Sequence, residues 1–111
     1  QQELEVAAAR AEIELDKAAR DRELAVRTAW LSLKNALAAL KGRKEAVDLA
    51  EEAHRIAVIR LRNGLATPLE RLDAELAMTT ARGQLAQALF LYSVARAQLE
   101  MAVGTKDIYG Q

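Results

Sequence analysis

The chain has 111 residues, with 16 basic and 16 acidic side chains and no cysteine. The balanced charge excludes the basic field that nucleic-acid-binding proteins usually carry, and the absence of cysteine excludes disulfides and thiolate metal sites. Alanine occurs 24 times and aromatic residues make up only 4% of the chain. Because alanine has the highest helix propensity and allows close backbone approach, this composition favours closely packed long helices over a compact globule.

The first predicted helix covers residues 3–62, a stretch without proline in which helix-forming residues dominate. Its weak point is Gly42, since a glycine inside a helix costs about 1 kcal/mol relative to alanine. A bend, or a loop that would give three helices, is the alternative. No capping residue or proline accompanies Gly42, so the sequence favours one unbroken helix. The chain also begins in a helical pattern, which indicates a segment of a larger protein.

Charged residues four positions apart recur along this first helix. Such pairs stabilise a solvated helix face modestly. They predict four ion pairs: Asp16 with Arg20, Glu23 with Arg27, Lys44 with Asp48, and Glu51 with Arg55.

A tight turn at residues 63–67 separates the two helical patterns. Gly64 can adopt the left-handed conformation that ends many helices, and Leu65 can fold back toward Ile59. Thr67 is expected to cap the next helix, Pro68 fits its first position, and Glu70 completes a T-x-x-E capping box. The sequence therefore predicts a helical hairpin with its tip at 63–67.

The second helix is predicted over residues 68–103, with Gly104 as its stop and 105–111 as a short tail. Paired antiparallel about the tip, it leaves residues 1–26 of the longer first helix as an overhang without a partner in this chain. The fold class is thus all-α: a long antiparallel coiled-coil hairpin that forms one domain over residues 1–104.

Each predicted helix carries more than one apolar stripe with coiled-coil spacing. One stripe of the second helix contains Leu65, Leu69, Leu72, Leu76, Thr79, Gly83, Ala86 and Phe90, and the other contains Ala74, Met78, Ala81, Leu85, Tyr92, Ala95, Leu99 and Ala102. The first helix has an alanine-rich stripe (Ala25, Ala29, Ser32, Ala36, Ala39, Arg43, Ala46, Ala50, Ala53, Ala57) and a larger one (Val26, Trp30, Leu33, Leu37, Leu40, Val47, Val58, Leu61).

A lone hairpin needs only one apolar stripe per helix. Two stripes indicate that each helix packs against neighbours on two sides, as in a helical bundle or a closed barrel of helices. As an isolated chain the molecule is expected to self-associate, most simply as an antiparallel four-helix dimer.

No pattern in the sequence indicates catalysis, a cofactor or a metal site. The single histidine, His54, has no cysteine partner, and its neighbours are ordinary helix-surface charges. Two acidic residues, Glu70 and Asp73, fall near the start of the second helix, where the helix dipole favours carboxylates. Capping explains Glu70. Asp73 is less needed there, and in a symmetric assembly it would recur around the axis as a ring that could select cations.

The tip and its flanks resemble the outer-membrane efflux protein family, the trimeric exit ducts related to TolC. The resemblance rests on RLRNGLAT at 60–67, LDAE at 72–75, TARGQLAQAL at 80–89 and ARAQL at 95–99, closing on Gly104. The segment TAWLSL at 28–33 also resembles a family phrase in the long helix. Leu61 is a departure, because the family usually has tyrosine there.

The resemblance implies a homotrimeric outer-membrane duct of a Gram-negative bacterium, with this segment in the periplasm and most similar to the C-terminal repeat. Gly64, Leu65, Ala66 and Thr67 would contact the helical hairpin of a periplasmic adaptor, which links the duct to an inner-membrane transporter. Glu70 and Asp73 match acidic positions that line the entrance in some members. Such a duct serves drug efflux or type I secretion and is not an enzyme. A stand-alone soluble coiled-coil scaffold is the alternative.

Overall fold

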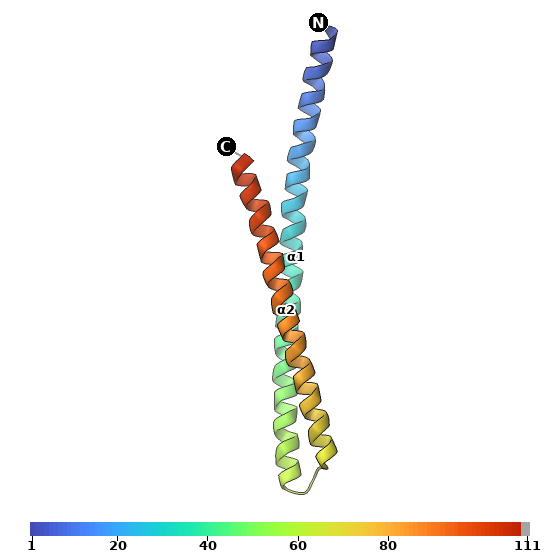
Figure 1. Cartoon of the computed structure of the whole chain (residues 1–111), viewed down its shortest axis with the longest axis vertical. Helices are drawn as coiled ribbons and strands as arrows, with labels where there is room; N and C mark the ends of the chain where they lie inside the picture. Colours follow the sequence, from blue (N-terminus) through green and yellow to red (C-terminus); the bar gives the residue numbers. More distant parts are fainter. Residues whose placement is uncertain (110–111) are drawn as a thin grey trace. The chain divides into compact units, whose positions relative to one another are not determined.

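The computed structural model describes residues 1–109, and beyond Gly104 it describes only the course of the helix. Its two helices, α1 (Gln2–Arg62) and α2 (Pro68–Tyr109), are joined by one turn (Figure 1). The described residues contain no β-strand. The predicted fold class, an all-α hairpin of two long helices, is confirmed.

The prediction that α1 runs unbroken through Gly42 is also confirmed. A β-carbon at Gly42 would meet no atom within 4 Å, so neither a close contact nor a turn requires glycine there. Strong helix formers on both sides offset the cost of about 1 kcal/mol.

The predicted stop at Gly104 is wrong, because α2 continues to Tyr109. Only Gly64 among the described glycines has a positive φ. Gly104 is followed by no proline or capping pair. A single glycine weakens a helix but does not end it without such signals. The predicted tail of 105–111 is therefore helical over 105–109, and residues 110–111 lie outside the described part of the chain.

The chain divides into two compact units, which we describe separately. The hairpin unit is Lys34–Val94 and contains the turn. The terminal unit combines Gln1–Leu33 with Ala95–Gln111.

In the hairpin unit the two helices pair along one stripe each, which we call the inner seam. Its spacing alternates between three and four residues, as in a coiled coil. Its most buried members are Leu40, Val47, Ala81 and Ala88, and its half-buried members are Ala36, Ala50, His54, Ala57, Leu61, Ala74, Met78, Leu85 and Tyr92. On α1 the inner seam draws on both predicted stripes, whereas on α2 it is the stripe that begins at Ala74.

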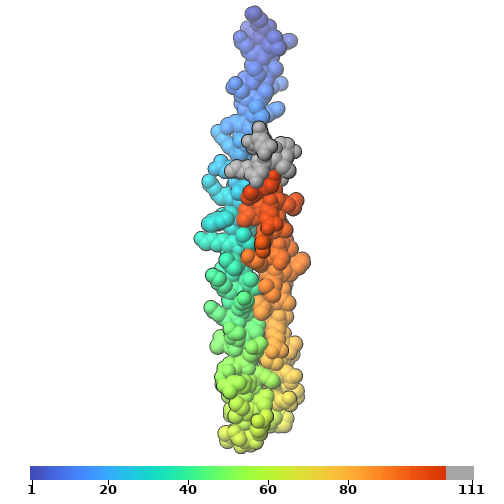
Figure 2. Space-filling view, turned by 90° about the vertical axis from the view of Figure 1, so that its left-hand side faces the viewer, coloured from blue at the N-terminus to red at the C-terminus, as the bar shows by residue number. Residues whose placement is uncertain are grey.

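Two polar contacts between side chains join α1 to α2 in the antiparallel register of the hairpin unit. The Arg43 guanidinium donates to Gln84 Oε1 at 2.8 Å, and Arg82 forms an ion pair with Glu51 at 3.2 Å. In Figures 1 and 2 the two helices of this unit lie side by side.

The terminal unit shows the same seam spacing. Ala95 is only 5% exposed, and the half-buried apolar residues are Val26, Ala29, Leu33, Leu99 and Ala102. Every residue from Gln1 to Asp21 is exposed. This uncovered stretch lies within the predicted overhang of residues 1–26, in which Arg22 and Val26 are half-buried.

Candidate functional site

The turn ends α1 in the way that the sequence predicts. Gly64 has a φ of +71°. Its N–H donates to the Leu61 carbonyl at 3.0 Å, and the Leu65 N–H donates to the Arg60 carbonyl at 2.8 Å. These two bonds define a Schellman motif, with Gly64 as the left-handed residue just past the helix end. A third bond, from the Arg60 guanidinium to the Leu65 carbonyl at 3.1 Å, ties the turn to the last helical turn.

The start of α2 confirms Thr67 as the cap and Pro68 as the first helical residue. The Thr67 hydroxyl accepts a hydrogen bond from the Glu70 N–H at 3.2 Å, and its carbonyl accepts one from the Arg71 N–H at 3.3 Å. The reciprocal bond of a capping box, from the Thr67 N–H to the Glu70 carboxylate, does not form among the described residues. The predicted box is therefore half made, and the Glu70 carboxylate stays in solvent.

The four predicted tip residues present mainly one side chain outward. Leu65 is 67% exposed. Gly64 and Thr67 are exposed but serve the backbone turn, and Ala66 is half-buried. Because hydrogen bonds hold this turn, Leu65 would lose little conformational entropy if another molecule packed against it.

The two predicted acidic residues lie close together on the surface beside this turn. Glu70 and Asp73 are both exposed and are three positions apart, so they occupy neighbouring places on one side of α2. Leu61, in contrast, is half-buried in the inner seam. The position where the resembling family has tyrosine therefore faces the seam in this chain.

The other predicted stripe of α2, which begins at Leu65, is left uncovered. We call Leu69, Leu72, Leu76, Thr79, Gly83, Ala86 and Phe90 the outer stripe. Its large members are 56–66% exposed. The outer stripe is offset from the inner seam by two residues, about 200° at roughly 100° per residue, so the two lie on nearly opposite faces of α2. The spacing of apolar residues predicted both stripes but could not show which of them packs against α1.

The surface ion pairs agree only partly with the prediction. Asp16 with Arg20 and Glu23 with Arg27 form at 3.0 and 3.5 Å. Glu51, predicted to pair with Arg55, instead reaches across to Arg82.

Arg55 pairs with Glu52, and this hydrogen bond lowers the pKa of the Glu52 carboxyl. Lys44 and Asp48 form no ion pair within the described chain. The cross-helix partner of Glu51 depends on how the two helices are rotated, which spacing along one helix cannot reveal.

His54 lies in the inner seam and offers no catalytic arrangement. Its Nε2 atom is buried and has no hydrogen-bond partner. No cluster of three or more histidine, cysteine or acidic residues that could hold a metal ion occurs in the described chain.

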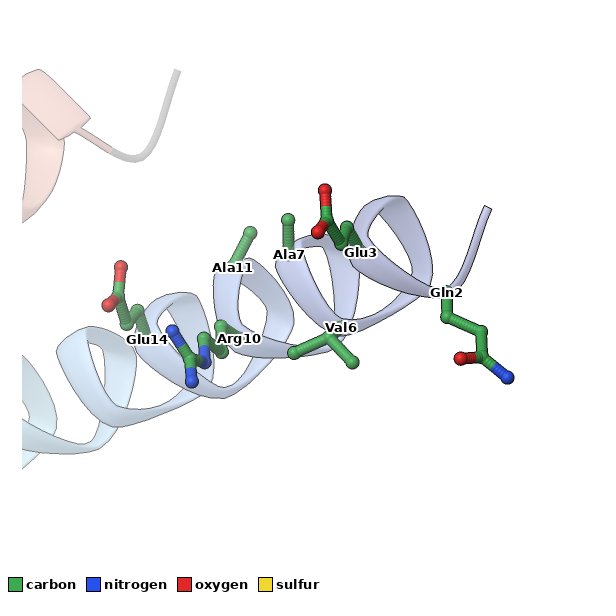
Figure 3. A pocket seen from close by; sticks show the side chains of 7 residues that line it. All are labelled: Gln2, Glu3, Val6, Ala7, Arg10, Ala11 and Glu14. Carbon is green, nitrogen blue, oxygen red and sulfur yellow. The ribbon is translucent and has the colours of Figure 1, made fainter.

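One surface concavity also lacks the converging side chains of a binding site. It is lined by residues of a single helix, α1, and its side chains point outward in different directions (Figure 3). No helix in the described part of the chain has the length and apolarity needed to cross a membrane.

Comparisons with protein-family models, with curated proteins and with solved structures found no match for this chain. The turn and the outer stripe are therefore the two features of the chain that bear on its function.

Proposed function

We propose that this chain is a periplasmic wall hairpin of an outer-membrane export duct and that its turn docks onto a periplasmic adaptor protein. The observation that carries the proposal is the turn itself, which presents the exposed Leu65 beside an uncovered apolar stripe. The order of sequence phrases around this turn, which resembles that of the efflux duct family, supports the same reading.

The outer stripe suits a helix that forms part of a wall. A helix in the interior of a wall needs apolar contacts on two faces, one toward its hairpin partner and one toward the next hairpin. α2 has both, since the inner seam is covered by α1 and the outer stripe is free. In the proposed duct, three copies of the full protein close the wall around a central passage.

The turn suits docking to another helical hairpin. Its backbone is tied by the Schellman bonds and the Thr67 cap, and its leucine offers an apolar knob of the kind that fits between the residues of a facing helix. The adaptor would in turn connect the duct to an inner-membrane transporter for drug efflux or type I secretion.

Glu70 and Asp73 would line the entrance of such a duct. Repeated by the symmetry of a trimer, they form a ring of carboxylates close to the tips, and rings of this kind attract cations and repel anions. The duct acts through contact and opening, without a catalytic step.

The test is the change Leu65→Glu in the complete protein, expressed in a Gram-negative host that lacks its own duct. We expect the charged side chain to disrupt adaptor docking, so that a fluorescent efflux substrate accumulates several-fold in the cells. A cysteine at residue 65 should crosslink to the adaptor hairpin in the otherwise unchanged protein.

Leu65→Met is the matched control, since it keeps an apolar side chain of similar size and should leave efflux unchanged. Immunoblots of the outer-membrane fraction verify equal amounts of each variant. Normal efflux by Leu65→Glu at equal abundance would overturn docking at the turn and would favour the stand-alone coiled-coil scaffold.

A further inference from the structure

The outer stripe of α2 is asymmetric in side-chain size. Its half near the turn is large, with Leu69, Leu72 and Leu76, whereas the following positions are small, namely Thr79, Gly83 and Ala86. Phe90 closes the stripe at its far end and is 66% exposed. Between Leu69 and Ala86 the stripe therefore has three large residues followed by three small ones. When two such stripes run in opposite directions, the large residues of one face the small residues of the other.

Gly83 has no explanation within the chain. A β-carbon at this position would meet nothing within 4 Å, and its φ is not positive. Glycine in the middle of a helix costs about 1 kcal/mol relative to alanine. Glycine on a helix face is useful where another backbone or a bulky side chain approaches closely, and no such neighbour exists among the described residues.

We propose that a second copy of this chain packs against the outer stripe, antiparallel and with two-fold symmetry. The spacing of the outer stripe alternates between three and four residues and is the same when read in the reverse direction. When Leu76 faces the partner's Thr79, every other stripe residue before Phe90 therefore also faces a stripe residue of the partner. Leu72 then faces the partner's Gly83, and Leu69 faces the partner's Ala86. Every one of these layers joins one large side chain to one small one, and the symmetry makes each layer occur twice.

The ends of the contact are also matched. The same register places Phe90 beside the partner's turn, where Leu65 is 67% exposed. The contact from Leu69 to Phe90 is about 32 Å long at roughly 1.5 Å per residue. Both Phe90 rings and both Leu65 side chains thereby bury apolar surface that is otherwise exposed to solvent, which favours the association.

Charge complementarity supports the same register. Glu75 and Arg82 flank the outer stripe on the same side, seven residues apart, which is one coiled-coil repeat. In the antiparallel pair Glu75 lies next to the partner's Arg82, and the partner's Glu75 lies next to Arg82. Glu75 has no ion pair within the described chain, and the Arg82 side chain, although paired with Glu51, is 55% exposed and can serve both carboxylates.

A parallel arrangement of two copies fits the outer stripe less well. It would place Leu72 against Leu72 and Gly83 against Gly83, which crowds one layer and leaves a cavity at another. Both the overpacked layer and the cavity reduce the packing energy of such a dimer. The outer stripe therefore selects the antiparallel partner.

The experiment uses the purified 111-residue chain, which has no native cysteine. Sedimentation equilibrium at high micromolar concentration should give the mass of two chains. The double variant Leu72→Cys/Gly83→Cys should form a disulfide-linked dimer on mild oxidation. Within one helix these two positions are about 16 Å apart at roughly 1.5 Å per residue, too far for an internal disulfide.

Leu72→Cys alone is the matched control. In the antiparallel dimer the two copies of residue 72 are about 16 Å apart along the axis, so no covalent dimer should form. A covalent dimer from Leu72→Cys alone would show a parallel pair and overturn the proposal. A mass of one chain would also overturn it. In the proposed duct the next hairpin would cover the outer stripe instead, so the antiparallel dimer is an assembly of the isolated 111-residue chain. These measurements need no adaptor, and a failed dimer therefore leaves the duct proposal standing.

A size exchange checks the register without cysteines. Gly83→Leu should weaken the dimer at least tenfold, because it places two leucines in one layer, although leucine improves helix propensity and keeps the hairpin folded. Leu72→Ala/Gly83→Leu restores one large and one small residue to that layer and should recover most of the affinity. An unchanged dimerisation constant for Gly83→Leu would contradict the proposed layer.

Discussion

At the scale of single residues, most of the turn follows from local chemistry. Gly64, Thr67 and Pro68 occupy the positions that the sequence predicts, because backbone conformation and capping depend on a few neighbouring residues. Gly104 lacks these neighbours, since no proline or capping pair follows it. The helix therefore continues to Tyr109.

His54 is the residue whose replacement gives the clearest prediction. Its Nε2 is buried without a partner, and burying an unpaired polar atom costs about 1–3 kcal/mol. His54→Leu removes this cost and adds an apolar side chain to the inner seam. We expect the free energy of unfolding to rise by about 1 kcal/mol, measured by urea denaturation at a fixed protein concentration.

His54→Gln is the control for this change, because it retains a polar side chain of similar length in the seam. It should bring no gain in stability. If His54→Leu is no more stable than His54→Gln, the buried nitrogen is satisfied in solution, for example by water.

At the scale of helices, periodicity predicted the two long elements and the apolar stripes that they carry. It could not show which stripe of α2 meets α1. The inner seam of α2 contains many small residues, including Ala81 and Ala88, whereas the outer stripe contains three leucines and a phenylalanine. Ranking by hydrophobicity alone would have chosen the outer stripe. Close approach of the two backbones, which alanine permits, favours the observed pairing instead.

Ala88 tests this account of close approach. It is 7% exposed in the inner seam, where a larger side chain would force α1 and α2 apart. We expect Ala88→Leu to lower the free energy of unfolding by about 1–3 kcal/mol. Ala77→Leu, at an exposed position of the same helix, should change it by no more than about 0.5 kcal/mol. Equal effects of the two changes in urea denaturation would show that the inner seam can accommodate a larger side chain at residue 88 without separating the helices.

At the scale of the whole molecule, the described chain has a seam in each unit and a long uncovered stretch of α1. An isolated helical segment is only marginally stable in water, since tertiary packing supplies most helix stability. Composition and helix length predicted the presence of such a stretch. The uncovered stretch of the described chain runs from Gln1 to Asp21.

Hydrogen exchange should distinguish the uncovered part of α1 from the part that packs against α2. The amides of residues 3–21, where no side chain is covered, should exchange at least tenfold faster than those between Leu40 and Val47, the two buried residues of α1. Mass spectrometry of peptic fragments measures both segments in the same sample. Uniform protection along α1 would show that residues 3–21 are covered in solution, for example by another chain.

The turn has one more consequence, which concerns the choice between two alternative hairpins. α2 has two apolar stripes on nearly opposite faces, so a half rotation of this helix about its axis would offer α1 a second, bulkier surface. Hydrogen bonds tie Gly64 and Leu65 to the end of α1, and others tie Thr67 to the start of α2. A turn held at both ends leaves little freedom for that rotation. A short, tied connection thus sets the rotational phase of α2. It is the turn that keeps the leucines outside, where another molecule can reach them.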